Sequence, residues 1–383
     1  MLAEDTSPRR RTRPKGRKQQ ILDSAATLFV QNGFPNVTMN AIAASVDITA
    51  GALYRHYPNK AELLALAIRQ SLDSFPRIDS TSSLDEALSL ACDAAVRHRQ
   101  LGALWSRQLQ YLPDDDQAEL REHLRDINRT YLALIERYRP ELSREQARLL
   151  SRAVESVLSS PGTHSLVLPS AEYAGLLKTA CRSLCDTHLS ENAGPASPSV
   201  PALEPVSRRE LLLQKAIQLF AAKGVHATSM EDIGATVGVT GPSLYTHFRG
   251  KEDILAAALD RATQALWLDL GEALHQHSDA RQALQAVVRG YVRRTHGRLQ
   301  LTSLALIDSR DDPTVRTRQR EYVREWVALI RSSRSDLEQA PARALAHAGL
   351  AVIHDVSRTP AAFDTSIEDN LTAMVMAILG CAD

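Results

Sequence analysis

Apolar residues recur at intervals of three and four along most of the chain, which is the spacing of one face of an α-helix. The first such stretch begins at residue 17 and stops at Gly33, a residue suited to the left-handed conformation just past a helix end. Runs of β-branched residues bounded by turns are scarce, and aromatic residues make up only 5% of the 383 residues. The pattern predicts an all-α protein without a sheet.

Short helices are predicted after this first stretch. Thr38 stands where an N-cap hydroxyl would accept a backbone N–H bond, and Thr49 opens a second short helix in the same way. Asn59 together with Glu62 opens a longer helix. Two short helices separated by a tight turn and packed on a preceding helix form a helix-turn-helix, whose second helix can enter the major groove of DNA.

The whole pattern occurs twice. Residues 17–68 align without a gap with residues 208–259, at an offset of 191, and 18 of the 52 positions are identical. At an offset of 195, residues 121–160 align with residues 316–355, which places Tyr131 opposite Trp326. A fixed internal period has to be interpreted before any local feature. The chain is therefore predicted to contain two copies of one two-part unit.

The overall composition says little about function, but the distribution of charged residues along the chain is informative. Lysine plus arginine equal aspartate plus glutamate at 45 each. Residues 9–18 nevertheless hold seven basic side chains and no acid, which favours a polyanion as partner, with a solubilising tail as the alternative. Residues 191–206 contain four prolines and predict an extended linker before the second copy.

The four cysteines and the hydropathy exclude several classes. No C-x-x-C pair occurs, and Cys181 with Cys185 is interpreted as two buried apolar residues in a reducing cytosol. No run of about 18 apolar residues predicts a membrane span. Asp114, Asp115 and Asp116 fit the charged start of a helix better than a metal site. No motif groups a nucleophile with a base, so we expect no enzyme activity, no cofactor and no metal.

The two copies resemble the DNA-binding region of TetR-family transcriptional regulators. In the first copy the resemblance rests on Leu28, Phe29, Gly33, Thr38, Met39, Ile42, Leu53, Tyr54, His56 and Lys60. In the second it rests on Leu219, Phe220, Gly224, Ser229, Met230, Ile233, Leu244, Tyr245, His247, Phe248 and Lys251. Beyond these regions only a helical pattern is shared.

The resemblance implies a fold and an organisation. Family members act as homodimers, each subunit with one reading head and one ligand pocket, and this chain resembles two such subunits fused, like the tandem TetR-type repressors of actinobacteria. The implied parts are an arm (1–16), a first helix-turn-helix (17–62), a first ligand-binding and pseudo-dimerisation domain (63–190), a linker (191–206), a second helix-turn-helix (207–253) and a second such domain (254–383). The implied partners are a double-stranded DNA operator and a small-molecule effector, in the bacterial cytoplasm or on the nucleoid.

The resemblance also implies DNA contacts in each head. In the first head the matching positions are Thr38, Thr49, Ala50, Gly51, Ala52, Tyr54, Arg55, His56 and Lys60. In the second they are Ser229, Thr240, Gly241, Pro242, Ser243, Tyr245, Thr246, His247 and Lys251. The Tyr, His and Lys positions, with Thr38 and Ser229, resemble the family's phosphate clamp. Among the base-facing residues of the first head only Arg55 can form a bidentate contact with guanine, and Thr246 replaces it in the second head. We therefore expect two unlike half-sites and an asymmetric operator.

Large side chains mark the expected effector sites, and apolar helices the expected interface. Trp105, Tyr111, Tyr131, Trp267 and Trp326 are the candidates to line ligand pockets, with ordinary core positions as the alternative. Helices at 144–160, 170–185, 341–357 and 366–381 are candidates for an intramolecular four-helix bundle in place of a homodimer interface. Two other functions remain open: a ligand-independent architectural DNA-binding protein, and a small-molecule binding protein with decayed heads.

Overall fold

The computed structural model describes residues 16–73, 76–78, 81–99, 104, 108–190, 203–223, 225, 227–239, 241–296, 313–357 and 366–382. The described residues are helical or lie in turns and loops, and none is in a strand, as the sequence predicts. The chain divides into two compact units. The first comprises residues 1–77 and 97–127, and the second comprises residues 78–96 and 128–383.

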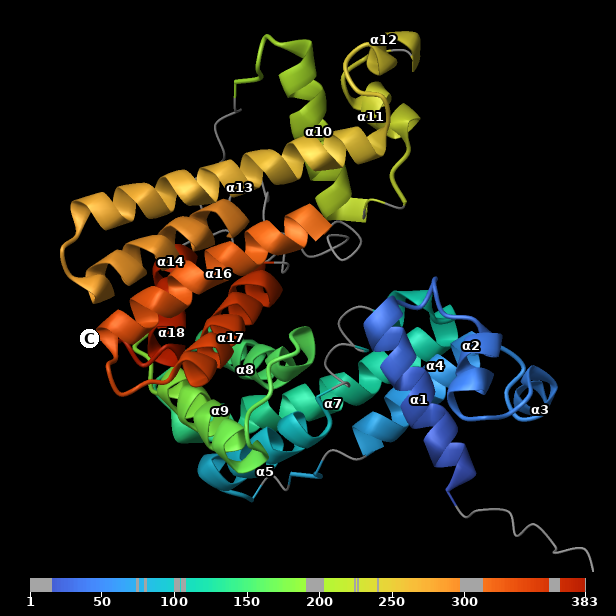
Figure 1. Cartoon of the computed structure of the whole chain (residues 1–383). Helices are drawn as coiled ribbons and strands as arrows, with labels where there is room; N and C mark the ends of the chain where they lie inside the picture. Colours follow the sequence, from blue (N-terminus) through green and yellow to red (C-terminus); the bar gives the residue numbers. More distant parts are fainter. Residues whose placement is uncertain are drawn as a thin grey trace, which may run out of the picture. The chain divides into compact units, whose positions relative to one another are not determined.

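The first unit contains the first helix-turn-helix (Figure 1). Its elements are α1 (Arg17–Asn32), α2 (Met39–Ser45), α3 (Ala50–Tyr54), α4 (Lys60–Asp73), η1 (Leu109–Tyr111) and the first half of α7 (Asp114–Tyr138). The core contains residues of α1, α2, α3 and α4, and Leu104, Leu112 and Leu120 extend it toward α7. The head is therefore larger than its helix-turn-helix.

The second unit contains the remaining helices. They are α5 (Leu84–Arg97), the second half of α7, α8 (Arg144–Ser159), η2 (Ser160–Thr163), α9 (Ser170–Cys185), α10 (Arg208–Lys223), α11 (Met230–Thr236), α12 (Gly241–Tyr245), α13 (Lys251–Gln276), α14 (Ala280–His296), α16 (Pro313–Ser333), α17 (Gln339–Ser357) and α18 (Ser366–Ile378). Helices α10, α11 and α12 lie at the start of the long helix α13, and α14 and α16 run beside the rest of α13 (Figure 1).

The helix caps predicted at Thr38 and Thr49 are present, and the second head has a further cap. Thr38 Oγ1 accepts the N–H of Ala41 at 3.1 Å, and Thr49 Oγ1 accepts that of Ala52 at 3.3 Å. Ser229 and Asp232 form a capping box, with both bonds at 3.0 Å. Each cap satisfies N–H groups that the first helical turn leaves without a partner. Thr240 lies outside the described residues.

Helices α8, α9, α17 and α18 pack together within the second unit, as the apolar pattern predicts (Figure 1). Alanine and glycine on α17 allow close approach: a Cβ atom at Gly349 would lie 3.0 Å from Cγ1 of Val375 on α18. Apolar residues make up much of the buried face of α17, among them Ala344, Ala348, Val352 and Ile353. Helices from the two sequence copies thus share one core.

Candidate nucleic-acid interface

Helix α3 presents its polar side to solvent. Leu53 is fully buried and fixes α3 in the head, while Thr49, Arg55 and His56 are exposed. The Tyr54 side chain is 52% exposed, an unusual value for an aromatic residue that follows a buried leucine. An exposed tyrosine with adjacent basic side chains on a short helix suits contact with phosphates and base edges.

The second head shows the same arrangement. Leu244 is buried and Tyr245 is 51% exposed, while Ser243 and Thr246 are exposed. Thr246 Oγ1 donates to the carbonyl oxygen of Ser243 at 2.7 Å. The side chain of Pro242 lies outside the described part of the chain. The tyrosine and histidine positions therefore agree between the heads, and the residue between them differs.

Arg55 and Thr246 occupy equivalent positions in the two heads, but their side chains differ in length and in the hydrogen bonds they can form. Arg55 Nε donates to the carbonyl oxygen of Gly51 at 3.3 Å, which directs the guanidinium along α3. The hydroxyl of Thr246 is engaged by its own helix. A guanidinium can form two parallel bonds to guanine, whereas a threonine hydroxyl can form one bond to either kind of base. The exposed side chains at this equivalent position therefore differ in chemistry.

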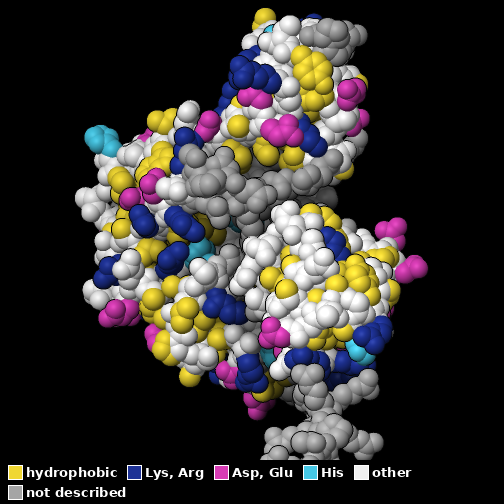
Figure 2. Space-filling model, turned by 45° about the vertical axis from the view of Figure 1, so that its right-hand side comes forward, with side chains coloured by type: hydrophobic (Ala, Val, Ile, Leu, Met, Phe, Trp, Pro, Cys, Tyr) yellow, Lys and Arg dark blue, Asp and Glu magenta, His cyan; other side chains and the backbone are white. Residues whose placement is uncertain are grey.

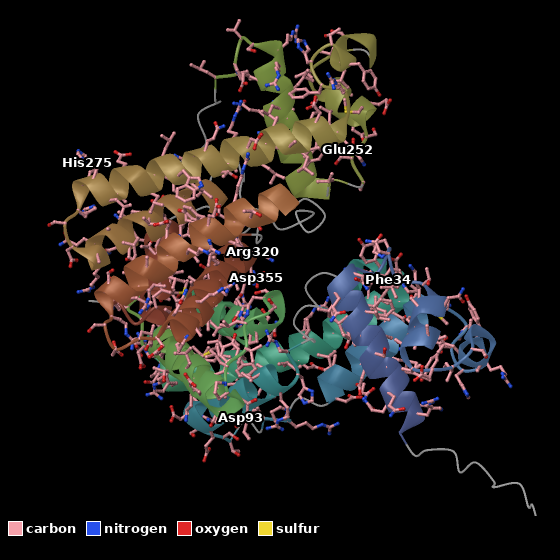
Figure 3. The ribbon with its side chains drawn as sticks, in the orientation of Figure 1. Phe34, Asp93, Glu252, His275, Arg320 and Asp355 are labelled. Carbon is pink, nitrogen blue, oxygen red and sulfur yellow. The ribbon has the colours of Figure 1, made fainter. Side chains whose placement is uncertain are left out.

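The Lys60 side chain is bound to the turn that follows α1. Its Nζ atom donates to the carbonyl oxygens of Phe34, Pro35 and Val37 at 2.8, 3.2 and 3.1 Å, and it lies 4.4 Å from the centre of the Phe34 ring. The three ammonium protons are thus engaged by the turn between α1 and α2, where Phe34 lies (Figure 3). Lys60 therefore helps to position the helix-turn-helix, and the direct phosphate contact that the resemblance implies stays a prediction.

Lys251 repeats this contact in the second head. Its Nζ donates to the carbonyl oxygen of Val225 at 3.2 Å, and Val225 is the residue equivalent to Phe34. The ring beneath the ammonium is absent there because valine replaces phenylalanine. Both heads consequently use a lysine at the start of a long helix to hold the turn that precedes the helix-turn-helix.

Gln108 is a positioning residue that the sequence did not reveal. Its Oε1 accepts the N–H of Phe34 at 3.1 Å, and its Nε2 donates to the carbonyl oxygen of Phe29 at 3.3 Å. The side chain is 4% exposed, and Tyr111 stacks on the Phe34 ring at 5.2 Å. No local sequence pattern announces a bond that spans 74 residues. Gln108 and Lys60 together fix the same turn.

The turn inside the helix-turn-helix differs between the heads. Asp47 has φ 53° in the first head, and Gly238 has φ 63° at the equivalent position in the second. A left-handed conformation favours glycine because any other side chain brings its Cβ near a carbonyl oxygen. The first turn is therefore strained where the second is not.

Polar pairs also differ between the heads at equivalent positions. In the first head the Gln70 amide donates to the Gln19 side chain, which joins α1 to α4. In the second head Arg261 forms two bonds to Glu210, at 2.7 and 2.8 Å, which join α10 to α13. The pairing raises the pKa of Arg261 and lowers that of Glu210. The same pair of helices is thus joined by neutral side chains in the first head and by an ion pair in the second.

Basic side chains extend the candidate surface. Figure 2 shows Lys, Arg and His side chains together on the lower edge of the first unit. Arg17 and Lys18, at the start of α1, are exposed. Residues 1–15, which hold the rest of the predicted basic arm, lie outside the described residues. In the second head Arg209 lies over the Phe248 ring at 4.5 Å.

The proposed ligand-lining residues fall into separate places. Trp105 lies outside the described residues, and Tyr111 belongs to the core of the first unit beside Phe34. Tyr131 is 2% exposed, and burial raises the pKa of its hydroxyl. Trp267 and Trp326 contribute to one aromatic cluster between α13, α14 and α16. Among the four candidates within the described residues, the structure therefore brings together Trp267 and Trp326.

Other site types receive no support within the described residues. No described helix is long and apolar enough to cross a membrane. No group of three His, Cys, Asp or Glu side chains among the described residues is placed to hold a metal ion. The cysteines are buried thiols, and hydrogen bonding to Cys92, together with burial, raises the pKa of Cys181. Thiols with raised pKa values are poor nucleophiles.

This fold and its exposed reading helices define a helix-turn-helix DNA-binding protein. A family model described as bacterial regulatory proteins, tetR family, matches residues 21–67 and again residues 212–258. The chain is 30% identical over 133 residues to IcaR, the negative transcriptional regulator of the biofilm operon of Staphylococcus epidermidis, and the match covers 32% of this chain and 70% of IcaR. The protein belongs to the TetR family of transcriptional regulators.

One further similarity is in sequence and another is in structure. The transcriptional activator FasR of Mycolicibacterium smegmatis is 37% identical over 84 residues, which cover 22% of this chain and 38% of FasR. The structure of the ketosteroid regulator KstR2 of Mycobacterium tuberculosis superposes with a TM-score of 0.40 at 19% identity, over 46% of this chain and 96% of that one. The chain thus spans well under half the length of FasR.

Proposed function

We propose that this protein is a repressor that binds an asymmetric operator as a single-chain pseudo-dimer and is released by a small apolar effector. The observation that carries the proposal is the pair of reading helices in one chain, with equal Tyr-x-His positions and unequal residues between them. Equal phosphate-facing residues dock both heads in the same way, and unequal base-facing residues select different sequences.

The packing of α8 and α9 with α17 and α18 supports the pseudo-dimer. Each pair comes from one copy of the repeat, and together they bury the face that a homodimeric relative would pair with a second chain. Two heads on one chain are not constrained to a palindrome, since that constraint follows from the identity of two subunits.

Repression is supported by the relatives. IcaR is named a negative regulator, and KstR2 of Mycolicibacterium smegmatis a transcriptional repressor. FasR is named an activator, so the direction of regulation needs its own test. A reporter behind the protein's operator gives it: expression falls with the protein present if it represses and rises if it activates.

The operator itself tests the asymmetry. DNA fragments selected from a random library by the full-length protein, followed by footprinting, should show one protected site with two unlike half-sites about one helical turn apart, roughly 34 to 36 Å. A palindromic site would reject the asymmetric operator. Diffuse protection would favour an architectural protein, and no protection would favour a small-molecule binding protein with decayed heads.

A further inference from the structure

An aromatic cluster lies in the second unit where α13, α14 and α16 meet α17. The Tyr291 ring stacks on Tyr322 at 6.0 Å and meets the edge of Trp326 at 5.7 Å, while Trp267 meets Tyr322 at 5.8 Å. Trp326 is fully buried, and Tyr322 and Tyr291 are 6% and 8% exposed. Arg320 on α16 and Asp355 on α17 mark these two helices in Figure 3. The cluster is apolar except for a few polar atoms.

Two of these polar atoms have no partner among the described residues. The Tyr291 hydroxyl is bonded to Nε2 of His354 at 2.8 Å, but the Tyr322 hydroxyl and Nε1 of Trp326 form no hydrogen bond. Burial raises the pKa of Tyr322, and the nearby Trp326 N–H lowers it by a smaller amount. The Tyr322 hydroxyl and Trp326 Nε1 do not, however, meet the geometry of a hydrogen bond. Buried polar groups are rarely left unpaired in folded proteins, and such exceptions call for an explanation.

The same position carries an unpartnered donor in the first copy of the repeat. Tyr131 on α7 is the residue equivalent to Trp326, and its buried hydroxyl also has no partner among the described residues. Its surroundings differ, since Cys92, Cys181 and Glu155 lie near the Tyr131 hydroxyl in place of aromatic rings. Tyr131 therefore gives a matched comparison for Tyr322: a buried hydroxyl without a partner that lies outside the aromatic cluster.

The charges near the second cluster restrict what it can accept. Asp269 and Arg294 form a two-bond ion pair at 2.5 and 2.6 Å, so neither charge needs a ligand. Because the two charges of this pair neutralise each other, the pair supplies no net positive charge beside the cluster. A carboxylate ligand would lose its hydration there without an opposing charge, whereas a neutral acceptor would not.

We propose that the cluster around Tyr322 and Trp326 is the binding site for a neutral, apolar or aromatic molecule whose carbonyl oxygen accepts hydrogen bonds from the Tyr322 hydroxyl and Trp326 Nε1. This inference rests on the proposed effector-released function and names the chemistry of its effector. One oxygen with two lone pairs can accept both adjacent donors. The rings of Tyr291 and Trp267, which pack against Tyr322, make the surroundings of these donors apolar.

The test uses three compounds of one shape in the absence of DNA. Acetophenone carries the carbonyl, ethylbenzene lacks it, and benzoate replaces it with a charge. Binding to the full-length protein is measured by saturation-transfer NMR titration for wild type, Tyr322→Phe and Tyr131→Phe. We expect acetophenone to bind more tightly than either other compound, Tyr322→Phe to weaken acetophenone about tenfold and leave ethylbenzene unchanged, and Tyr131→Phe to change neither.

A second measurement protects the result from a folding artefact. Tyr322→Phe removes only a hydroxyl without a partner, so its melting temperature should equal or exceed that of the wild type. A lower melting temperature would mean that the hydroxyl is satisfied within the fold, and the proposal would be wrong. Equal weakening of acetophenone and ethylbenzene, tighter binding of benzoate, or no binding of acetophenone would also overturn it.

The site and the function can fail separately. If acetophenone binds as expected but a saturating concentration leaves the selected operator bound, the site stands and the effector-released function is rejected. If the operator is bound and no compound binds, the regulatory function stands and the site is rejected.

Discussion

The side-chain amide of Asn370 on α18 holds the backbone of Ser190 from both sides. Its Oδ1 accepts the Ser190 N–H at 2.8 Å, and its Nδ2 donates to the Ser190 carbonyl oxygen at 3.4 Å. Asn370 is 2% exposed, and Ser190 is the last described residue before the proline-rich segment. The end of the first copy is thereby fixed to a helix of the second copy.

Asn370→Ala should lower the free energy of unfolding by about 1 kcal/mol, because the Ser190 N–H loses its partner while Gln146 Nε2 still donates to the Ser190 carbonyl oxygen. Urea unfolding measures the change. Asn36→Ala is the matched control, since the exposed Asn36 amide donates only to the carbonyl oxygen of Asn32, and its effect should stay within about 0.5 kcal/mol. Equal effects of the two substitutions would contradict the role of the Ser190 contact.

Lys60→Met should weaken DNA binding without changing its dependence on salt. The substitution leaves three carbonyl oxygens of the turn without their donor, which disorders the reading head but removes no phosphate contact. A lysine bound to a phosphate would contribute about 0.9 to the slope of log K against log salt concentration. The measurement is operator binding at several salt concentrations, with Lys18→Met as control. If Lys60→Met reduced the slope, Lys60 would have to contact a phosphate directly.

Arg55→Ala should relax sequence preference in one half-site only. The guanidinium is the bidentate donor of the first head, and its loss should cost about 1 to 3 kcal/mol of discrimination there. Selection of DNA by the variant from a random library measures the effect. Thr246→Ala, the equivalent change in the second head, should alter the other half-site. Uniformly weaker binding of all sequences by Arg55→Ala would show that Arg55 contacts phosphate.

Asp47→Gly should stabilise the first head by about 1 kcal/mol, because glycine adopts the left-handed conformation of this turn without the Cβ clash. The reverse experiment is Gly238→Ala in the second head, where φ is 63°, and it should destabilise the protein by a similar amount. Thermal unfolding detects both changes. A loss of stability in Asp47→Gly would mean that the aspartate side chain holds the turn.

The half-buried His347 of α17 should make the free energy of unfolding fall in acid. His347 stacks on His164 at 4.4 Å, and burial, together with Arg343, lowers the pKa of His347 to about 4. The unfolded chain therefore takes up the proton first as pH falls below about 6.5, and the folded state loses about 2 kcal/mol between pH 7 and 5 and about 3 kcal/mol by pH 4.

The variant His347→Phe isolates this effect. It keeps a ring against His164, so its unfolding free energy, subtracted from that of the wild type at each pH, should show the loss between pH 6.5 and 4. Glu155 acts with the opposite sign, since burial raises its pKa to about 7 and its contribution is lost as pH rises from 4.5 to 7, but this cancels in the subtraction. The exposed His275, labelled in Figure 3, supplies the control His275→Gln. A difference independent of pH would reject the prediction.

Local contacts were predictable, and contacts across the chain were not. The caps at Thr38, Thr49 and Ser229 connect residues three positions apart, so a short stretch of sequence contains both partners of each bond. Lys60 reaches carbonyl oxygens 23 to 26 residues away, and a lysine at that position looks the same whether it faces a phosphate or a turn.

The sequence by itself determined the helical class, the duplication, the helix-turn-helix in each copy and the family. These follow from periodicity and from motifs that repeat at a constant offset. Only the tertiary structure decided that Tyr111 packs in a head while Trp267 and Trp326 share a cluster, and that the Tyr322 hydroxyl and Trp326 Nε1 lie together without partners. The physical reason is that hydrogen-bond satisfaction depends on which helices meet, and periodicity defines the buried face of a helix but not the neighbour it packs against.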